Sequence, residues 1–382
     1  MSPGYSTDDR TISTTASIKC VQQRSSTAFV LLIAVSIAVS ACDLSQEPSS
    51  RVARGVYVSN QGNFSDANGS VTVYDPTSQV SAPMVSDAGS TIQSATIFNG
   101  RLYIIANTGG RVDVYSLSDN SASGQITGLA SPRYMAVGPA EIAYVTNLFK
   151  AGFVGGTVSI LDLVANTVIT TVDVGANPEG VAVVADRVYV ANHEFGAGTT
   201  LSVISTSSNQ VFDTIDVGCD GPRSVFRDRE DELWVVCTGV TSYDQDFNVV
   251  GRTSGSVVIL DGPTGDIVSR IPLSGQVATI GPGQDAYYSE PEQELYVVID
   301  NKRILRFNTG ANVLAENLGD FAGDPIGAVA YDGEADRLYI GRVPGFTTAG
   351  SVTIHDRSGD QLESFPAGIA PTAISFYFPD DE

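Results

Sequence analysis

The side chains best suited to binding or catalysis in this sequence are two arginines, a glutamate and a histidine. Arg133 and Arg223 are each able to hold a carboxylate or phosphate through paired hydrogen bonds. Glu179 and His193 accompany them as acid–base groups, so Glu179, His193 and Arg223 are the catalytic candidates. Pairing of an arginine with Glu179 in a water-filled channel is the structural alternative. No HExxH, GxSxG, P-loop or GxGxxG motif occurs in a fitting context, and the sequence predicts no metal or cofactor.

These residues belong to a sequence repeat that occurs seven times in the chain. In each repeat an aromatic residue begins an apolar run that ends in a small polar residue. The spacings between successive aromatics are 46, 41, 45, 45, 62 and 43 residues. A period near 45 with β-patterned units is typical of a ring of small sheets. The repeated aromatics are Tyr57, Tyr103, Tyr144, Tyr189, Trp234, Tyr296 and Tyr339.

Each repeat predicts four short strands. In the clearest repeat, strand a covers residues 180–183, strand b 187–192, strand c 200–204 and strand d 210–218. Apolar and polar residues alternate in these segments, β-branched residues are enriched, and clusters of Gly, Asn, Asp and Ser supply the turns. The predicted fold is therefore all-β: a seven-bladed β-propeller of four-stranded antiparallel blades.

Part of this repeat resembles a known family. The runs YVTN at 144–147, GGTVSILDLVANTVITTVDVGANPEGVAV at 155–183 and YVAN at 189–192 are similar to the YVTN-type β-propeller repeat of secreted and surface bacterial proteins. The likeness departs from the pattern at residues 294–323. It implies a propeller in an exported bacterial protein and carries little information on function.

The two ends of the repeat region complement each other. Residues 368–376 resemble a strand a without a following strand b, and residues 55–60 resemble a strand b without a preceding strand a. Joined in one blade, they close the ring and leave no free sheet edge. The predicted organisation is a signal peptide at 1–41, a tether at 42–53 and the propeller at 54–382.

The two faces of the predicted ring differ. The a–b and c–d turns are short, whereas the b–c loops on the other face are long, rich in glycine and aromatic. Long loops on a rigid scaffold are usual binding sites, although each aromatic could instead fill a gap between blades. The loop aromatics are Phe64, Phe149, Phe153, Phe195, Tyr243, Phe247 and Phe346. The start of strand a lines the channel mouth on the same face, at Gln93, Arg133, Glu179, Arg223, Gln284 and Thr372.

The cysteines indicate an exported protein. Residues 27–41 form an apolar run too short to span a membrane comfortably, and a basic segment precedes it. Val39 to Cys42 (VSAC) resembles the lipobox of bacterial lipoproteins, in which the cysteine is diacylated; an ordinary cleavable signal is the alternative.

Cys219 and Cys237 are predicted to form a disulfide, because they lie symmetrically about position 228 in an a–b hairpin. Two buried free thiols are the alternative.

The mature part of the chain is strongly acidic. Residues 42–382 contain 18 Lys and Arg against 41 Asp and Glu, a net charge of −23. Such a surface repels phosphate, so no nucleic-acid binding is predicted. Only two of the 18 basic residues are lysines. This composition is typical of halophilic proteins, with an ordinary acidic secreted protein as the alternative.

The sequence therefore predicts a monomeric lipoprotein of the bacterial cell envelope, periplasmic or surface-exposed, held at the membrane by lipid alone. Its predicted role is non-enzymatic binding of a small molecule, glycan or envelope protein on the long-loop face. Resemblance to lactonase-type propellers implies an alternative, a hydrolase using Arg133, Glu179, His193 and Arg223 at the channel mouth. A structural role in a surface layer is a third reading.

We expect the mature protein to begin at Cys42, with residues 1–41 removed and a diacylglyceryl group on the cysteine. Mass spectrometry of the membrane fraction checks this. Replacing Cys42 by Ser should release the protein from the membrane, because no other anchor is predicted. An intact peptide spanning residues 41–43 as the dominant species would contradict the expectation.

Overall fold

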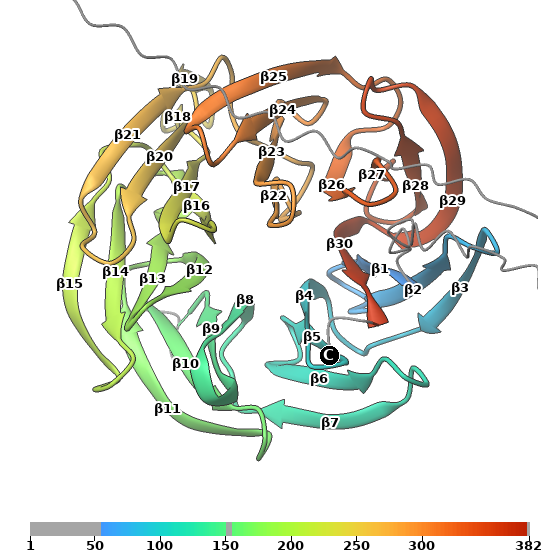
Figure 1. Ribbon diagram of the computed structural model, residues 1–382, viewed down its shortest axis with the longest axis horizontal. Helices are drawn as coiled ribbons and strands as arrows, with labels where there is room; N and C mark the ends of the chain where they lie inside the picture. Colours follow the sequence, from blue (N-terminus) through green and yellow to red (C-terminus); the bar gives the residue numbers. More distant parts are fainter. Residues whose placement is uncertain (1–54, 150–154, 380–382) are drawn as a thin grey trace, which may run out of the picture. The chain divides into compact units, whose positions relative to one another are not determined.

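The computed structural model describes residues 55–149 and 155–379, which form seven four-stranded antiparallel sheets arranged in a ring (Figure 1). The predicted seven-bladed β-propeller is thus confirmed. Two single-turn 3-10 segments, η1 (Pro139–Glu141) and η2 (Glu194–Gly196), lie between strands. No helix among the described residues has the length and apolar character needed to cross a membrane. The predicted signal peptide, tether and Cys42 lie outside these residues.

Each blade runs from an inner strand at the channel to an outer strand at the rim (Figure 1). The first blade consists of β30 (Pro371–Tyr377), β1 (Gly55–Asn60), β2 (Ser70–Asp75) and β3 (Val80–Val85). The second consists of β4 (Ile92–Phe98), β5 (Arg101–Ala106), β6 (Arg111–Ser116) and β7 (Ala122–Thr127). The third consists of β8 (Pro132–Val137), β9 (Ile142–Asn147), β10 (Gly156–Asp162) and β11 (Thr167–Val174). The fourth and fifth consist of β12 (Pro178–Val184), β13 (Arg187–Asn192), β14 (Thr200–Ser205) and β15 (Gln210–Asp216); and β16 (Pro222–Arg227), β17 (Glu232–Cys237), β20 (Ser256–Asp261) and β21 (Ile267–Pro272). The last two consist of β22 (Ala286–Ser289), β23 (Glu294–Ile299), β24 (Arg303–Asn308) and β25 (Val313–Asp320); and β26 (Ile326–Asp332), β27 (Arg337–Arg342), β28 (Ala349–His355) and β29 (Gln361–Ile369).

The hydrophobic core lies between the blades. Seven apolar clusters fill the seven interfaces, each built from two neighbouring sheets. Between the fourth and fifth blades, for example, Tyr189 and Val203 pack against Leu233 and Val258. Both faces of the second strand are covered, which explains why these strands read as near-continuous apolar runs.

The seven repeated aromatics occupy the second strand of every blade and are all buried. Two of their hydroxyls also bridge to the following blade. Tyr57 donates to Asn120 Oδ1 over 3.0 Å, and Tyr189 donates to the Gly262 carbonyl over 2.5 Å. The repeated aromatic therefore packs one blade against the next, which is a structural reason for its recurrence.

An asparagine at the end of the second strand fixes the start of the long loop in three blades. Asn60, Asn147 and Asn192 are buried, and the side-chain Nδ2 of each donates to two hydroxyls of the adjacent third strand. Asn192, for example, contacts Thr200 and Ser202 at 3.0 Å each. This side chain holds the strand and the loop base together while the loop beyond is free to vary.

The ring is closed by the pairing of β1 with β30, as predicted. The two strands run antiparallel, with Val58 opposite Ile374 and Val56 opposite Phe376. In Figure 1, β30, the last strand of the chain, lies beside β1, the first strand described. Closure therefore depends on segments more than 300 residues apart in the sequence.

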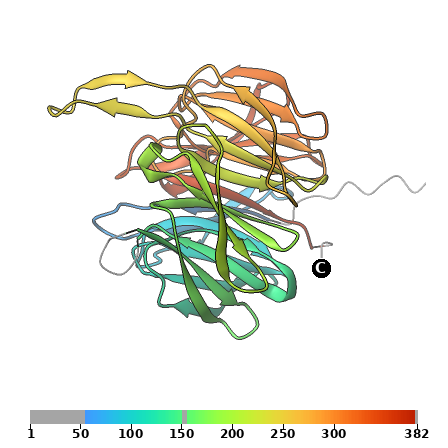
Figure 2. The ribbon, with the colours of Figure 1, turned by 90° about the vertical axis from the view of Figure 1, so that its left-hand side faces the viewer.

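The long loop of the fifth blade is not the plain glycine-rich loop expected from the sequence. It forms a hairpin of β18 (Thr241–Tyr243) and β19 (Val249–Arg252), which projects away from the ring (yellow in Figure 2). At its base, Val240 and Thr253 are joined by two hydrogen bonds of 2.9 Å each. Residues 240–252 (VTSYDQDFNVVGR) show no regular alternation of polar and apolar residues that would have predicted the hairpin.

The structure joins Cys219 to Cys237 in a disulfide with Cα atoms 6.2 Å apart. The register argument used to expect it needs correction, because Pro222 is the residue that pairs with Cys237 in the ladder. Cys219 lies before β16. Gly218 and Gly221 have φ values of +62° and +65°, so the chain turns sharply on both sides of the cysteine and brings its sulfur back to the strand.

Removing residues 371–382 should destabilise the propeller by about 5 kcal/mol or more. The deletion takes away β30, exposes an edge of β1 and removes the buried Ile374 and the ring of Phe376, each contributing about 1.5–3 kcal/mol of burial. Chemical denaturation checks this, with deletion of residues 380–382 as control. Equal midpoints for the two deletions would contradict the role of β30.

Candidate functional site

The inner strands place the predicted channel-mouth residues around one end of the channel. Gln93, Arg133, Glu179 and Arg223 lie at the second position of β4, β8, β12 and β16, and Thr372 lies at the second position of β30. Gln284 lies just before β22, and its backbone N–H donates to the Thr372 backbone carbonyl over 2.8 Å. Because these inner strands run in the same direction, their starts gather on the long-loop face.

A connecting segment, residues 273–285 between β21 and β22, crosses the channel at this end and is called the crossing segment below. The Gln93 side-chain amide donates to the Pro282 carbonyl over 2.8 Å from the second blade. Arg223 donates to the Gly283 carbonyl over 3.1 Å from the fifth blade. Blades on opposite sides of the ring therefore hold the crossing segment. It closes the channel mouth on the long-loop face, a closure that was not predicted from the sequence.

The crossing segment also packs closely against the seventh blade. The backbone N–H of Ile280 donates to the Ile326 carbonyl over 2.9 Å. A Cβ atom at Gly283 would lie 1.9 Å from the Gly327 carbonyl oxygen, so glycine alone fits there. The aromatic ring of Phe346 lies against Gly281 on the loop side. One of the predicted loop aromatics therefore supports the closure of the channel.

Two buried ion pairs form the centre of the site, and we call the side chains of Gln93, Arg133, Glu179, Arg223 and Asp285 the central cluster. Arg133 Nε donates to Glu179 Oε2 over 3.1 Å, its Nη2 contacts Glu179 Oε1, and its Nη1 contacts Gln93 Oε1. Arg223 Nη1 lies 3.1 Å from Asp285 Oδ2. Pairing of an arginine with Glu179 is the alternative to anion binding that was considered from the sequence, and the structure shows this pairing.

The central cluster is electrically balanced, with two guanidinium groups and two carboxylates. Burial by itself would raise the pKa of Glu179, but Arg133 and Arg223 outweigh it and the pKa is lowered. Burial would lower the pKa of Arg223, but Asp285 and its other neighbours raise it. Glu179 and Arg223 therefore stay charged, and each arginine is paired with a carboxylate, so neither has an uncompensated charge to offer an anion.

A depression of about 220 Å³ lies on the loop side of the central cluster. Its wall includes Arg133, Glu179, His193, Arg223 and Phe195, so the structure brings the four hydrolase candidates together. Burial lowers the pKa of His193 to about 4, against the opposite effect of the Glu179 carboxylate. The imidazole is neutral at pH 7, and its Nε2 lies 3.3 Å from the Thr238 hydroxyl.

The loop aromatics divide into exposed and supporting residues. Phe64, Phe195, Tyr243 and Phe247 expose 72, 73, 58 and 86% of their surface. Phe346 is less exposed, Phe149 is partly buried, and Phe153 lies outside the described residues. His355 packs against Phe321 and hydrogen-bonds Thr353, a structural position. Within residues 55–149 and 155–379, no three His, Cys, Asp or Glu side chains are grouped to hold a metal ion.

Sequence reasoning missed two parts of this site. Asp285 was not recognised as the partner of Arg223, because the repeat alignment placed its neighbour Gln284 in the ring. The crossing segment was also missed, although the 62-residue spacing between Trp234 and Tyr296 is the longest of the six and reflects it together with the β18–β19 hairpin.

The fold and the balanced centre define the class: a seven-bladed β-propeller with its channel closed on the loop face. More particularly, the chain belongs to the family described as "Domain of unknown function (DUF5074)", which matches residues 54–263, more than half of its length. No curated protein matches the chain.

Several solved structures have a similar fold. A functionally unknown protein from Desulfotomaculum acetoxidans DSM 771 superposes with a TM-score of 0.64 at 11% identity, covering 86% of this chain and 100% of that one. A quinonprotein alcohol dehydrogenase-like protein from Bacteroides thetaiotaomicron VPI-5482 gives 0.60 at 13%, covering 85% and 78%. Kuenenia stuttgartiensis hydrazine synthase gives 0.57 at 17%, covering 76% and 94%. At these identities the likeness shows the fold alone.

The lowered pKa of His193 predicts a pH-dependent loss of stability. The unfolded pKa is near 6.5, so between about pH 6.5 and 4 the unfolded chain binds more protons, and stability falls as the pH is lowered. The loss should reach about 2–3 kcal/mol, at about 1.4 kcal/mol per pH unit discounted for partial exposure. Denaturation midpoints of wild type and His193→Gln across this range measure it. Parallel pH profiles for the two proteins would contradict the assignment.

Proposed function

We propose that this protein is an exported lipoprotein of the bacterial cell envelope that binds a protein or glycan partner with the long-loop face of its propeller. The observation that carries the proposal is the exposure of four aromatic side chains on loops of that face. Aromatic residues are enriched where surfaces bind, because they bury a large area at low entropic cost. The VSAC run at Cys42 and the likeness to the YVTN-type repeat support the export and anchoring.

The spacing of these aromatics favours an extended partner over a small molecule. Phe64 lies in the first blade, Phe195 in the fourth, and Tyr243 and Phe247 on the hairpin of the fifth. The channel mouth between them is closed by the crossing segment, and the nearby depression measures only about 220 Å³. A protein or glycan that lies across the loops is able to reach several of them at once.

The distribution of charge indicates which kind of partner the long-loop face would bind. Arg133 and Arg223 are already paired with Glu179 and Asp285, and the mature chain carries a net charge of −23. An anionic partner would meet repulsion from the net charge, and Arg133 and Arg223 have no unpaired charge to offset it. The favoured partner is therefore neutral or basic where it meets the loops, and we propose that the propeller acts as a monomer.

A hydrolase of the lactonase type is the second candidate, because Arg133, Glu179, His193 and Arg223 line one depression. His193 is in the neutral form that a general base requires, but its lowered pKa makes it a weak base at pH 7, and Glu179 is held by Arg133. Turnover in a panel of lactones that disappears in His193→Gln would favour this candidate over non-enzymatic binding.

Replacing Phe195 and Phe247 by Ala should weaken partner binding roughly tenfold or more, since truncating an anchor residue typically costs 1 kcal/mol or above. A photo-crosslinking amino acid at each position, expressed in the native envelope, identifies the partner, and titration of that partner measures the loss. The melting temperature should not change, because both side chains are exposed.

Val164→Ala is the matched control, since Val164 is an exposed apolar residue in the turn between β10 and β11 on the opposite face. It should leave partner binding unchanged. Full affinity in the double Phe variant, or equal loss in Val164→Ala, would show that the long-loop face is not the binding surface.

A further inference from the structure

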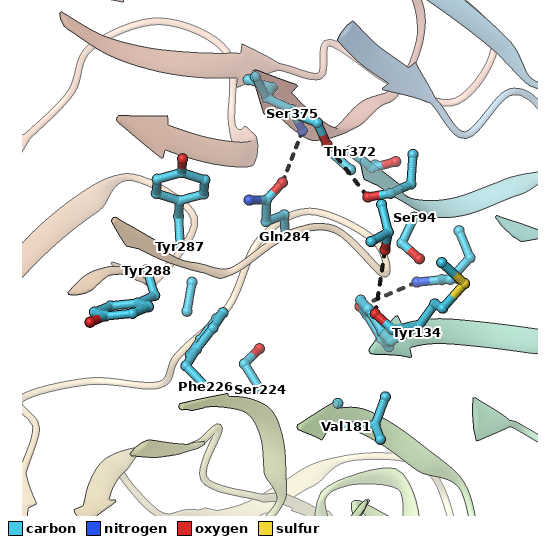
Figure 3. Close-up of a pocket in the computed structure, with 18 of the residues that line it drawn as sticks. Ser94, Tyr134, Val181, Ser224, Phe226, Gln284, Tyr287, Tyr288, Thr372 and Ser375 are labelled. Carbon is cyan, nitrogen blue, oxygen red and sulfur yellow. Dashed lines mark hydrogen bonds between the residues drawn. The ribbon is translucent and has the colours of Figure 1, made fainter. Parts of the chain in front are cut away.

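A second hollow lies inside the ring, beyond the central cluster. It measures about 410 Å³ and is lined by six of the seven inner strands: β4, β8, β12, β16, β22 and β30. Figure 3 shows labelled side chains from these strands around a common centre. The volume lies in the range usual for small-molecule sites. We call this hollow the channel cavity.

The channel cavity opens on the short-turn face. At the start of the inner strands its wall is closed by the buried Gln93 and Thr372, beside the crossing segment. Near the ends of the strands the lining residues Ile97, Phe226 and Tyr288 are only half-buried. We infer that its entrance lies there, on the side opposite the long loops, so that the two faces of the propeller carry separate recesses.

The lining is aromatic and uncharged. Tyr134, Phe226, Tyr287 and Phe376 contribute rings, and no Asp, Glu, Lys, Arg or His side chain is among the residues that line it. This contrasts with the acidic surface of the molecule. Transfer of a charged group into such surroundings without a partner is unfavourable, so the cavity selects against ions.

Several hydrogen-bond donors in the lining have no partner among the described residues: Gln284 Nε2 and the hydroxyls of Tyr287, Tyr288 and Thr372. Gln284 Oε1 accepts from the Ile374 backbone N–H over 2.9 Å, which fixes the amide plane and turns Nε2 away from that bond (Figure 3). Tyr287, three residues further along the chain, also lines the cavity and packs against Phe376, and its hydroxyl has no hydrogen bond among the described residues. Burial raises the pKa of Tyr287, so its hydroxyl stays protonated and is able to donate.

We propose that the channel cavity binds an uncharged, planar aromatic molecule that offers a carbonyl oxygen to Gln284 Nε2 and the Tyr287 hydroxyl. Its ring would pack between the aromatic side chains of the wall. This site is independent of the loop-face partner, because it uses different residues and opens on the other face.

Benzamide is the first probe, with benzoate, benzylammonium and cyclohexanecarboxamide as matched companions. Saturation-transfer NMR on the whole propeller, followed by titration, should show benzamide bound most tightly. Benzoate and benzylammonium should bind at least about tenfold more weakly, since each would bury an unpaired charge. The saturated ring should also bind more weakly, because it cannot stack.

Two near-isosteric variants test the donors. Gln284→Glu keeps the oxygen that accepts from Ile374 but replaces the donor by a carboxylate. It should lower benzamide affinity about tenfold and raise that of benzylammonium, a reversal that general loosening would not produce. Tyr287→Phe should lower benzamide affinity about threefold to tenfold, as expected for one lost hydrogen bond.

Leu362→Ala, at an exposed position of the outer strand β29, serves as the control and should leave benzamide affinity unchanged. Absence of benzamide binding in the millimolar range would overturn the proposal. So would benzoate binding as well as benzamide, or unchanged benzamide affinity in both Gln284→Glu and Tyr287→Phe. None of these results bears on the loop-face partner, whose test uses separate variants.

Discussion

The antiparallel pairing of β1 with β30 is the contact on which the rest of the propeller depends. Every apolar cluster lies between two blades, so each blade is stable only while both neighbours are present. An unpaired β1 would leave one interface half-built and a sheet edge open to solvent. Because β30 also carries Thr372 and Phe376 into the channel wall, ring closure and assembly of the recesses are one event.

Closure of the ring creates a second requirement at its axis, where the starts of the inner strands converge. Polar side chains that meet there lose water and must find partners within the ring. Arg133 with Glu179, and Arg223 with Asp285, meet this requirement, and the crossing segment supplies carbonyl groups to Gln93 and Arg223. These contacts lie between the loop-side depression and the channel cavity.

The periodic features of the sequence predicted the fold well, because each repeated aromatic has the same burial in every blade. Strands such as β13 were predicted residue for residue, and the split blade followed from the unmatched ends. Asp285 and the crossing segment break the repeat, so their role depends on which residues converge across the ring. A spacing pattern carries no information on that convergence. The hairpin β18–β19 was not predicted for the same reason, because it is an insertion without a counterpart in the other blades.

The hairpin β18–β19 begins and ends at one point, where Val240 and Thr253 are bonded to each other. The blade below it has the same four strands as its neighbours, and the Cys219–Cys237 bridge secures the strand from which the hairpin departs. Segments with adjoining ends are the places where genes gain or lose sequence without disturbing a scaffold. Natural variation in length and composition is thus free to accumulate at this projection (Figure 2) while the ring stays under constraint. Under the proposed function, a change in this hairpin would alter partner binding without altering the ring.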